Sequence, residues 1–185
     1  MKKIFCLITC LFAGAANAAL IDLAPQSTSV NGGSITYTNL ITPTDTFSDA
    51  LFSLSIAGDF DNNNSSESVF VSMEGFSLGR IFDNDTSNDL FNFANDDYLG
   101  SHNNMITMTG EAIIPQANWA SIIADGFINI TFDLSSGVNC CTNPHAFTSG
   151  NIQFDNIAAV PEPASLALLV LGLAGLGFSR KRKIS

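Results

Sequence analysis

Two stretches of the chain place oxygen-bearing side chains at alternate positions, an arrangement that could bind a cation. Calcium prefers such hard oxygen ligands, and alternate spacing within a turn points several of them inward. The side chains concerned are Asp59, Asp61, Asn63 and Glu67 in the first stretch and Asp83, Asp85 and Asp89 in the second. We therefore predict Ca2+ as a candidate ligand of these two loops.

The first stretch departs from the EF-hand, a common calcium-binding loop. Counted from Asp59, Asn64 occupies the position of the turn glycine, and Phe70 stands where a bidentate glutamate would close the loop. Asp and Asn also cap tight turns in proteins that bind no metal. Turn capping is therefore the alternative interpretation of both loops.

Histidines and paired acids are the residues that could support hydrolysis. The two histidines, His102 and His145, both lie in stretches typical of loops, and neither belongs to a zinc or nucleophile motif. Asp96 and Asp97 could serve a glycosidase only if two carboxyls faced a sugar across a cleft. We expect no catalytic residue, and a secreted hydrolase acting on matrix polysaccharide is the alternative.

Cys140 and Cys141 are adjacent, and they are the only cysteines left once an N-terminal segment carrying Cys6 and Cys10 is removed. Outside the cytoplasm these thiols should oxidise. Neighbouring Cα atoms are about 3.8 Å apart, whereas disulfides favour ~5.5 Å, so a ring between them would be strained. A vicinal disulfide is the preferred expectation, with intermolecular bridges or two thiols as alternatives.

Phenylalanine dominates the aromatic residues, with 15 Phe against two Tyr and one Trp. Sugar-binding faces usually stack on exposed Trp or Tyr, whereas Phe mostly fills cores. Trp119 and Tyr98 are the candidates for a small glycan site. Packing inside the domain is the alternative role for each of them.

Hydrophobic residues in the middle of the chain alternate with polar ones, which predicts strands. The clearest alternation covers residues 52–56, 69–73 and 128–134, and weaker strands are expected over 35–40, 76–82, 105–112 and 151–157. Clusters of Asn, Asp, Ser and Gly supply the turns between them. Only residues 115–124 suggest a helix, with Pro115 in its first turn. The expected fold class is all-β: an antiparallel β-sandwich of roughly eight strands, with jelly-roll topology.

The first 18 residues have the features of a secretory signal peptide. A basic start precedes an apolar run over residues 4–12, and a small-x-small cleavage site follows at Ala16-Asn17-Ala18. The Sec translocon and signal peptidase are therefore expected partners, and the mature chain should begin at Ala19. A lipoprotein site ending at Cys10 is the alternative, although it would leave a very short apolar run.

The last residues of the chain, 160–185, form a second targeting segment. It begins with Val160, Pro161, Glu162 and Pro163, continues with an apolar run over residues 164–178, and ends with the basic cluster Arg180, Lys181, Arg182 and Lys183. The prolines cannot continue a sheet and keep the chain extended. The apolar run is shorter than the ~20 residues of an untilted transmembrane helix, and the cluster holds its end in the cytoplasm. An uncut membrane anchor is the alternative.

In this order and at the end of the chain, the three parts resemble the PEP-CTERM sorting signal of exopolysaccharide-producing Gram-negative bacteria. The resemblance covers only this tail. It implies that exosortase, a membrane cysteine protease, recognises the segment, cuts near the motif and releases or transfers the chain. We therefore expect export across the inner membrane, transient anchoring, and final placement at the cell surface or in the extracellular matrix.

Between the two targeting segments, residues 19–159 are long enough for one domain. Sixteen of the 17 acidic residues lie there but only Arg80 of the seven basic ones, so this body carries a charge near −15. Nucleic acid is excluded as a partner, because the body has almost nothing to neutralise phosphates. We expect a non-catalytic surface or matrix protein that binds calcium or extracellular polysaccharide, with a self-associating adhesin as a further alternative.

Overall fold

The computed structural model describes residues 17–60, 65–83, 85, 87–93, 105–139 and 144–156. These residues belong to one compact unit, Asn17–Asn156. Residues 1–16 of the expected signal peptide, the sorting segment and the short transmembrane helix lie outside the described residues, whereas Asn17 and Ala18 belong to the first strand. Within the described part of the chain, no helix has both the length and the apolar character needed to span a bilayer.

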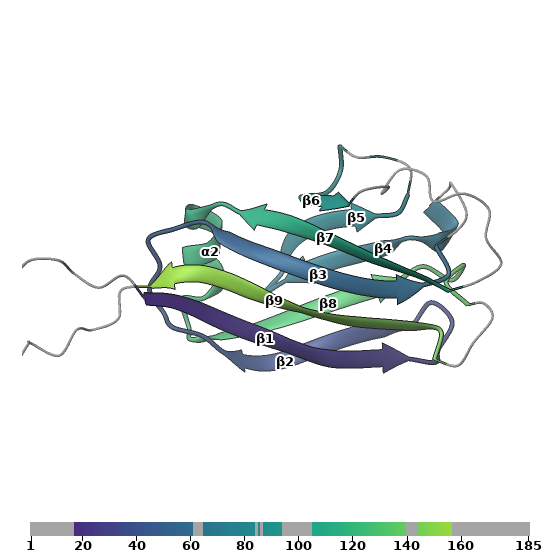
Figure 1. Ribbon diagram of the computed structural model, residues 1–185, viewed down its shortest axis with the longest axis horizontal. Coiled ribbons are helices and arrows are strands. Elements are labelled where there is room, and N and C mark those ends of the chain that lie inside the picture. Colours follow the sequence, from purple (N-terminus) through teal and green to yellow (C-terminus); the bar gives the residue numbers. More distant parts are fainter. Residues whose placement is uncertain are drawn as a thin grey trace, which may run out of the picture. The chain divides into compact units, whose positions relative to one another are not determined.

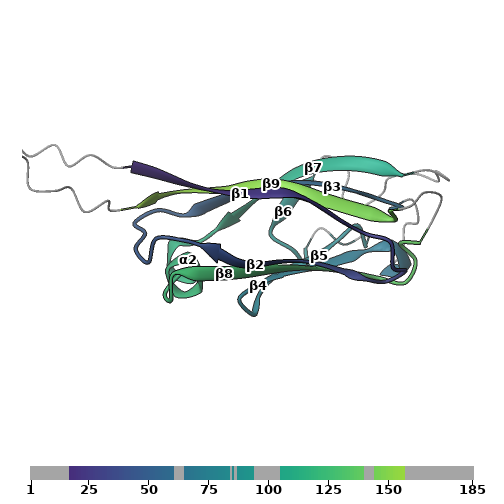
Figure 2. The ribbon, with the colours of Figure 1, turned by 90° about the horizontal axis from the view of Figure 1, so that it is seen from below.

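Two antiparallel sheets lie face to face and enclose the core (Figures 1 and 2). The five-stranded sheet has the order β1 (Asn17–Thr28), β9 (Ala146–Asn156), β3 (Ala50–Gly58), β7 (Ile106–Ile114), β6 (Phe91–Phe93). The four-stranded sheet has the order β2 (Ser34–Ile41), β8 (Phe127–Leu134), β4 (Val69–Met73), β5 (Phe76–Ile81). The described residues also include two short helices, η2 (Ser65–Glu67) and α2 (Gln116–Ile122).

The strand order confirms the predicted jelly roll. Strands one, nine, three and seven form one sheet, and strands two, eight, four and five form the other. Consecutive strands therefore alternate between the sheets for most of the chain, as two nested Greek keys require. The three residues of β6 add a fifth strand beside β7.

Alternating burial explains why the clearest strands form where the sequence predicts them. In β8 the side chains of Ile128, Ile130, Phe132 and Leu134 are buried, while the residues between them face outward. β4 shows the same alternation from Val69 to Met73. Each strand thus turns one wholly apolar face to the core, which fixes its register.

The strand β1 is absent from the sequence-based prediction because Pro25 interrupts its pattern. Ile21 and Leu23 are buried and alternate with exposed residues, as in the other strands. The pairing of β1 with β9 then shifts register between Leu23 and Gln26, on either side of Pro25. Proline has no N–H for a sheet ladder, so it is tolerated at such an irregularity in an edge strand.

The predicted helix is confirmed as α2, which begins one residue after Pro115. Trp119 and Ile122 are its buried residues, and Ile123 directly after it is buried as well. The Trp119 ring packs edge-on against Phe154 of β9, with ring centroids 4.9 Å apart. The helix therefore closes one end of the core.

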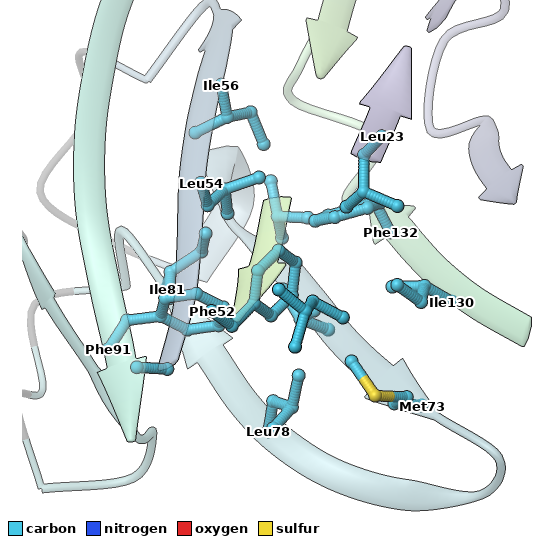
Figure 3. Packing of buried hydrophobic residues seen from close by; sticks show 14 of the residues in the cluster. Leu23, Phe52, Leu54, Ile56, Met73, Leu78, Ile81, Phe91, Ile130 and Phe132 are labelled. Atoms are coloured by element: carbon cyan, nitrogen blue, oxygen red, sulfur yellow. The ribbon is translucent and has the colours of Figure 1, made fainter. Parts of the chain in front are cut away.

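Phe52 lies at the centre of the core, between the two sheets (Figure 3). Its ring is fully buried and makes edge contacts with Phe91 at 5.5 Å and with Phe132 of the opposite sheet at 6.5 Å between centroids. Such edge-to-face pairs add to the free energy gained from burying the rings. The aromatic contacts thus join both sheets.

A buried hydrogen bond also joins the sheets. The hydroxyl of Tyr37 in β2 donates to the carbonyl oxygen of Thr148 in β9 at 2.8 Å, and lies 3.0 Å from the Thr148 hydroxyl. Tyr37→Phe removes this bond and leaves its buried partners short of a donor. We expect the free energy of unfolding to fall by about 1–3 kcal/mol, measured by urea denaturation.

The pH dependence of the Tyr37→Phe variant provides a second measurement. Burial raises the pKa of Tyr37 above its ordinary value of 10.0. The neutral phenol therefore favours the folded state, a contribution that is complete below pH 10.0 and is lost as the pH rises above it. The variant should show a smaller alkaline loss of stability than the wild type. Thr36→Val, an exposed change on the same strand, should leave both quantities unchanged.

Candidate functional site

The carboxylates of the second predicted calcium loop cap turns. Asp83 Oδ1 accepts the backbone N–H of Asp85 at 3.2 Å, and Asp85 Oδ1 accepts the N–H and hydroxyl of Ser87 at 3.0 and 2.6 Å. The Ser87 hydroxyl, together with its N–H, holds the pKa of Asp85 below its ordinary value. Asp89 Oδ1 accepts the N–H of Phe91 at 2.6 Å. These bonds favour the turn-capping interpretation of this loop.

The first predicted calcium loop is only partly described. Asp59 directly follows β3 and is buried, and Glu67 ends η2. Asp61 and Asn63 lie outside the described residues. Among the residues that the structure describes, no three His, Cys, Asp or Glu side chains gather into a group that could hold a metal ion. Calcium binding in this loop stays a prediction.

Of the remaining candidate residues, the structure describes Trp119 and His145. Trp119 is fully buried, so it cannot stack on a sugar ring. The backbone N–H of His145 donates to Thr28 at 2.8 Å, while its Nδ1 is buried without a hydrogen-bond partner in the described part of the chain. The remaining candidates lie outside the described residues: His102, Asp96, Asp97, Tyr98, Cys140 and Cys141.

The outer face of the five-stranded sheet is hollowed. A shallow depression of about 540 Å³ runs across strands β9, β3, β7 and β6. A second one of about 260 Å³ adjoins it and shares Ser55. Most of the outward side chains that line the larger depression carry hydroxyl or amide groups: Ser53, Ser55, Asn92, Thr109, Glu111 and Asn151. Among the described residues, no Lys, Arg or aromatic side chain lines it.

Five polar residues form one continuous row across this face. The strand register places Asp22 beside Asn151, Asn151 beside Ser53, Ser53 beside Glu111, and Glu111 beside Asn92. We call these residues the polar row. The Ser53 hydroxyl donates to Glu111 Oε1 at 3.4 Å, so neighbouring members of the row are close enough to interact. A shorter parallel row of Ser149, Ser55 and Thr109 lies beside it.

The polar row contains both hydrogen-bond donors and hydrogen-bond acceptors. Hydroxyl and amide groups both donate and accept, whereas the two carboxylates only accept when ionised. Neighbouring strands lie about 4.8 Å apart, so successive side chains in the row repeat at that interval. The row can therefore form several hydrogen bonds to one extended, hydroxyl-rich molecule. Sequence reasoning missed it because its members come from five separate strands.

The C-terminal segment matches a known family model. The PEP-CTERM protein-sorting motif aligns with residues 159–183. The chain carries a PEP-CTERM sorting motif. The matched stretch contains Pro161, Glu162 and Pro163, the apolar run and the basic cluster, all outside the described residues.

The PEP-CTERM motif indicates how the protein is exported and sorted. It marks an exported chain that is sorted through exosortase, a membrane protease. It also implies transient membrane anchoring before placement at the cell surface or outside the cell. The motif says nothing about the ligand of the body that precedes it.

Comparison with solved structures gives distant similarities. One is the CBM36-1 domain of a multidomain xylanase from the hindgut metagenome of Trinervitermes trinervoides, with 12% identity, a TM-score of 0.30, and coverage of 78% of this chain and 100% of that domain. Another is infectious bursal disease virus Gx strain, with 12% identity, a TM-score of 0.35, and coverage of 80% of this chain and 33% of the viral chain.

A third similarity is to the catalytic domain of a GH87 alpha-1,3-glucanase in complex with nigerose. It has 14% identity and a TM-score of 0.25, and it covers 82% of this chain and 31% of that one. No curated protein matches this sequence at a significant level. These TM-scores are low, and the jelly-roll fold follows from the strand order alone.

Proposed function

We propose that this protein is a non-catalytic component of the cell surface or extracellular matrix, and that it binds extracellular polysaccharide along the polar row. The supporting observation is the row itself: hydroxyl, amide and carboxylate groups repeat across all five strands of one sheet. A polysaccharide presents hydroxyl groups at regular intervals, so the two can form several hydrogen bonds at once.

Charge narrows the class of polysaccharide. The body carries a charge near −15, and the described residues that line the larger depression include Glu111 but no Lys or Arg. Uronic acid or sulfate groups would be repelled from such a surface. A neutral polysaccharide therefore fits the polar row better than an anionic one.

The spacing of carboxylates supports a binding role over hydrolysis. Asp22 and Glu111 are the two acids of the polar row, and strands β9 and β3 separate them. Three strand spacings amount to about 14 Å. Glycosidases need two carboxyls about 5–5.5 Å apart for retention or about 6.5–9.5 Å apart for inversion. The polar row lacks a pair at either distance.

Affinity electrophoresis tests this proposal. The secreted protein is run through gels that contain a soluble neutral polysaccharide, and slower migration measures binding. Ser53→Ala with Asn151→Ala removes two adjacent hydrogen-bonding side chains from the middle of the polar row. We expect a loss of ~2 kcal/mol, or about thirtyfold in affinity.

A matched control is available on the opposite sheet. Ser72 and Thr131 are neighbours on β4 and β8 and are half-buried on the outer face. Ser72→Ala with Thr131→Ala should leave binding unchanged. Equal weakening by both double variants, or migration unaffected by every neutral polysaccharide, would exclude the polar row as the site. Release of new reducing ends from the polymer would favour the hydrolase instead.

A further inference from the structure

Exposed apolar side chains gather at one end of the sandwich. Among the described residues, five large hydrophobic side chains that are 42–79% exposed lie at the end where β1 begins and β9 ends: Leu20, Ile41, Phe47, Ile113 and Phe127. We call these five residues the apolar collar. Single exposed hydrophobic residues are ordinary, but a group of them at one place marks an interaction surface.

The strand register shows how the collar is arranged. Leu20 and Ile113 stand at the two ends of a row that crosses β1, β9, β3 and β7, with Gln153 and the half-buried Leu51 between them. Ile41 pairs with Phe127 at the end of β2 and the start of β8. The collar therefore includes residues from both sheets.

Phe47 connects the collar to the end of the last strand. It lies in the loop between β2 and β3, and its backbone N–H donates to the backbone carbonyl oxygen of Asp155 in β9 at 3.4 Å. In Figure 1 the starts of β1 and β3 and the arrowheads of β2, β7 and β9 all lie at this same end. The collar thus surrounds the point at which β9 ends.

We propose that the apolar collar docks on the surface of a lipid bilayer while the chain is membrane-anchored. Only seven residues, 157–163, separate Asn156 at the end of β9 from the apolar run that begins at Ala164. Fully extended, they span at most about 25 Å. The end of β9 is thereby kept within reach of the bilayer, where exposed Phe, Ile and Leu side chains enter the boundary between headgroups and acyl chains.

Charge selects the kind of lipid. Asp45, Asp49 and Asp125 are exposed in the loops at this end, and Arg80 is the only Lys or Arg in residues 19–159. Anionic headgroups would repel these carboxylates, whereas zwitterionic headgroups would not. The proposal rests on the anchoring implied by the sorting motif and is independent of polysaccharide binding.

The experiment uses the full chain reconstituted in phosphatidylcholine vesicles. Phe127→Trp places a reporter in the collar, and Val30→Trp places a matched one in the exposed loop between β1 and β2. Trp119, the one native tryptophan, is fully buried and gives a constant background. We expect the emission of the Phe127→Trp variant to shift to the blue and to be quenched by brominated lipid, with neither effect in the Val30→Trp variant.

Removal of collar side chains supplies the second arm. Leu20→Ser with Ile113→Ser, made in the Phe127→Trp chain, should abolish the blue shift and most of the quenching. Val30→Ser with Leu90→Ser, which alters exposed hydrophobic residues outside the collar, should abolish neither. All four positions are exposed, so melting curves of the two double variants should match the parent and exclude unfolding as the cause.

Three results would overturn the proposal. The first is identical emission from the Phe127→Trp and Val30→Trp variants in vesicles. The second is stronger quenching when phosphatidylglycerol replaces phosphatidylcholine, because the acidic loops predict weaker contact. The third is a blue shift that appears in detergent-free oligomers and disappears on dilution, since it would make the collar a contact between two copies of the chain.

Discussion

Replacing Pro161, Glu162 and Pro163 together by alanine should leave the exported chain uncut and attached to the inner membrane. The motif spans residues 159–183, and its two prolines are expected to keep the chain between β9 and the apolar run extended. Without them, the segment can extend a strand or a helix, and the protease loses an extended substrate. Cell fractionation with intact-mass analysis measures the outcome, which should approach complete retention.

The matched control changes Ser165, which lies two residues after Pro163. Ser165→Ala keeps the prolines, the apolar run and the basic cluster, so processing should proceed as in the wild type. Release of the triple-alanine variant at the normal rate would mean that recognition resides elsewhere. A surface form of the wild-type chain that still carries Arg180 and Lys183 would mean that the chain is a plain anchor.

Strands with uninterrupted alternation could be predicted from the sequence alone. β4 has the predicted bounds, 69–73, and β8 begins one residue before the predicted range. In these strands each inward position is apolar and the outward positions are polar except at Phe70 and Phe127, so local pattern and tertiary burial agree. The turn between β4 and β5 is equally local, because Gly75 has a φ of +75° that glycine readily adopts.

Strands with interrupted patterns required the tertiary structure. β9 begins at Ala146, five residues before the predicted start, because Gly150 conceals its pattern. A Cβ atom on Gly150 would lie 2.2 Å from the carbonyl oxygen of Ser53, so glycine is required by the close approach of β3. β6 is only three residues long, and the ring of its Phe93 covers Gly110 of β7. Neither feature has a local signature.

The candidate site was even less accessible to sequence reasoning. Asp22 and Glu111 are 89 positions apart in the sequence, yet the register aligns both with Ser53. The alternation of a strand predicts which side chains face outward but not which strands lie side by side. The acidic residues between positions 83 and 89, in contrast, could be recognised in the sequence. They are close along the chain, and the structure uses them within local turns.

The polar row and the apolar collar are neighbours on one sheet. Leu20 of the collar lies two residues from Asp22 of the polar row on β1, and Ile113 lies two residues from Glu111 on β7. Residues two apart in a strand face the same side. If the collar meets lipid, the polar row lies just above the membrane surface during anchoring and is fully accessible after release.

Phe52→Ala should cause the largest loss of stability of any single change proposed here. The ring is fully buried and contacts Phe91 in its own sheet and Phe132 in the opposite one. Truncation removes buried apolar surface and leaves a cavity between the sheets, at a cost of about 3–5 kcal/mol. Since domains are stable by only about 5–15 kcal/mol, much of the stability would be lost.

Thermal denaturation followed by circular dichroism measures this loss. A cost of that size should lower the Tm by about 10–20 °C in a domain of this length. Phe127→Ala provides the control, because the side chain of Phe127 is largely exposed and its removal leaves no cavity in the core. Its Tm should stay within about 2 °C of the wild type, since surface changes of this kind cost less than about 0.5 kcal/mol. Similar Tm values for the two variants would mean that Phe52 does not hold the sheets together as its contacts indicate.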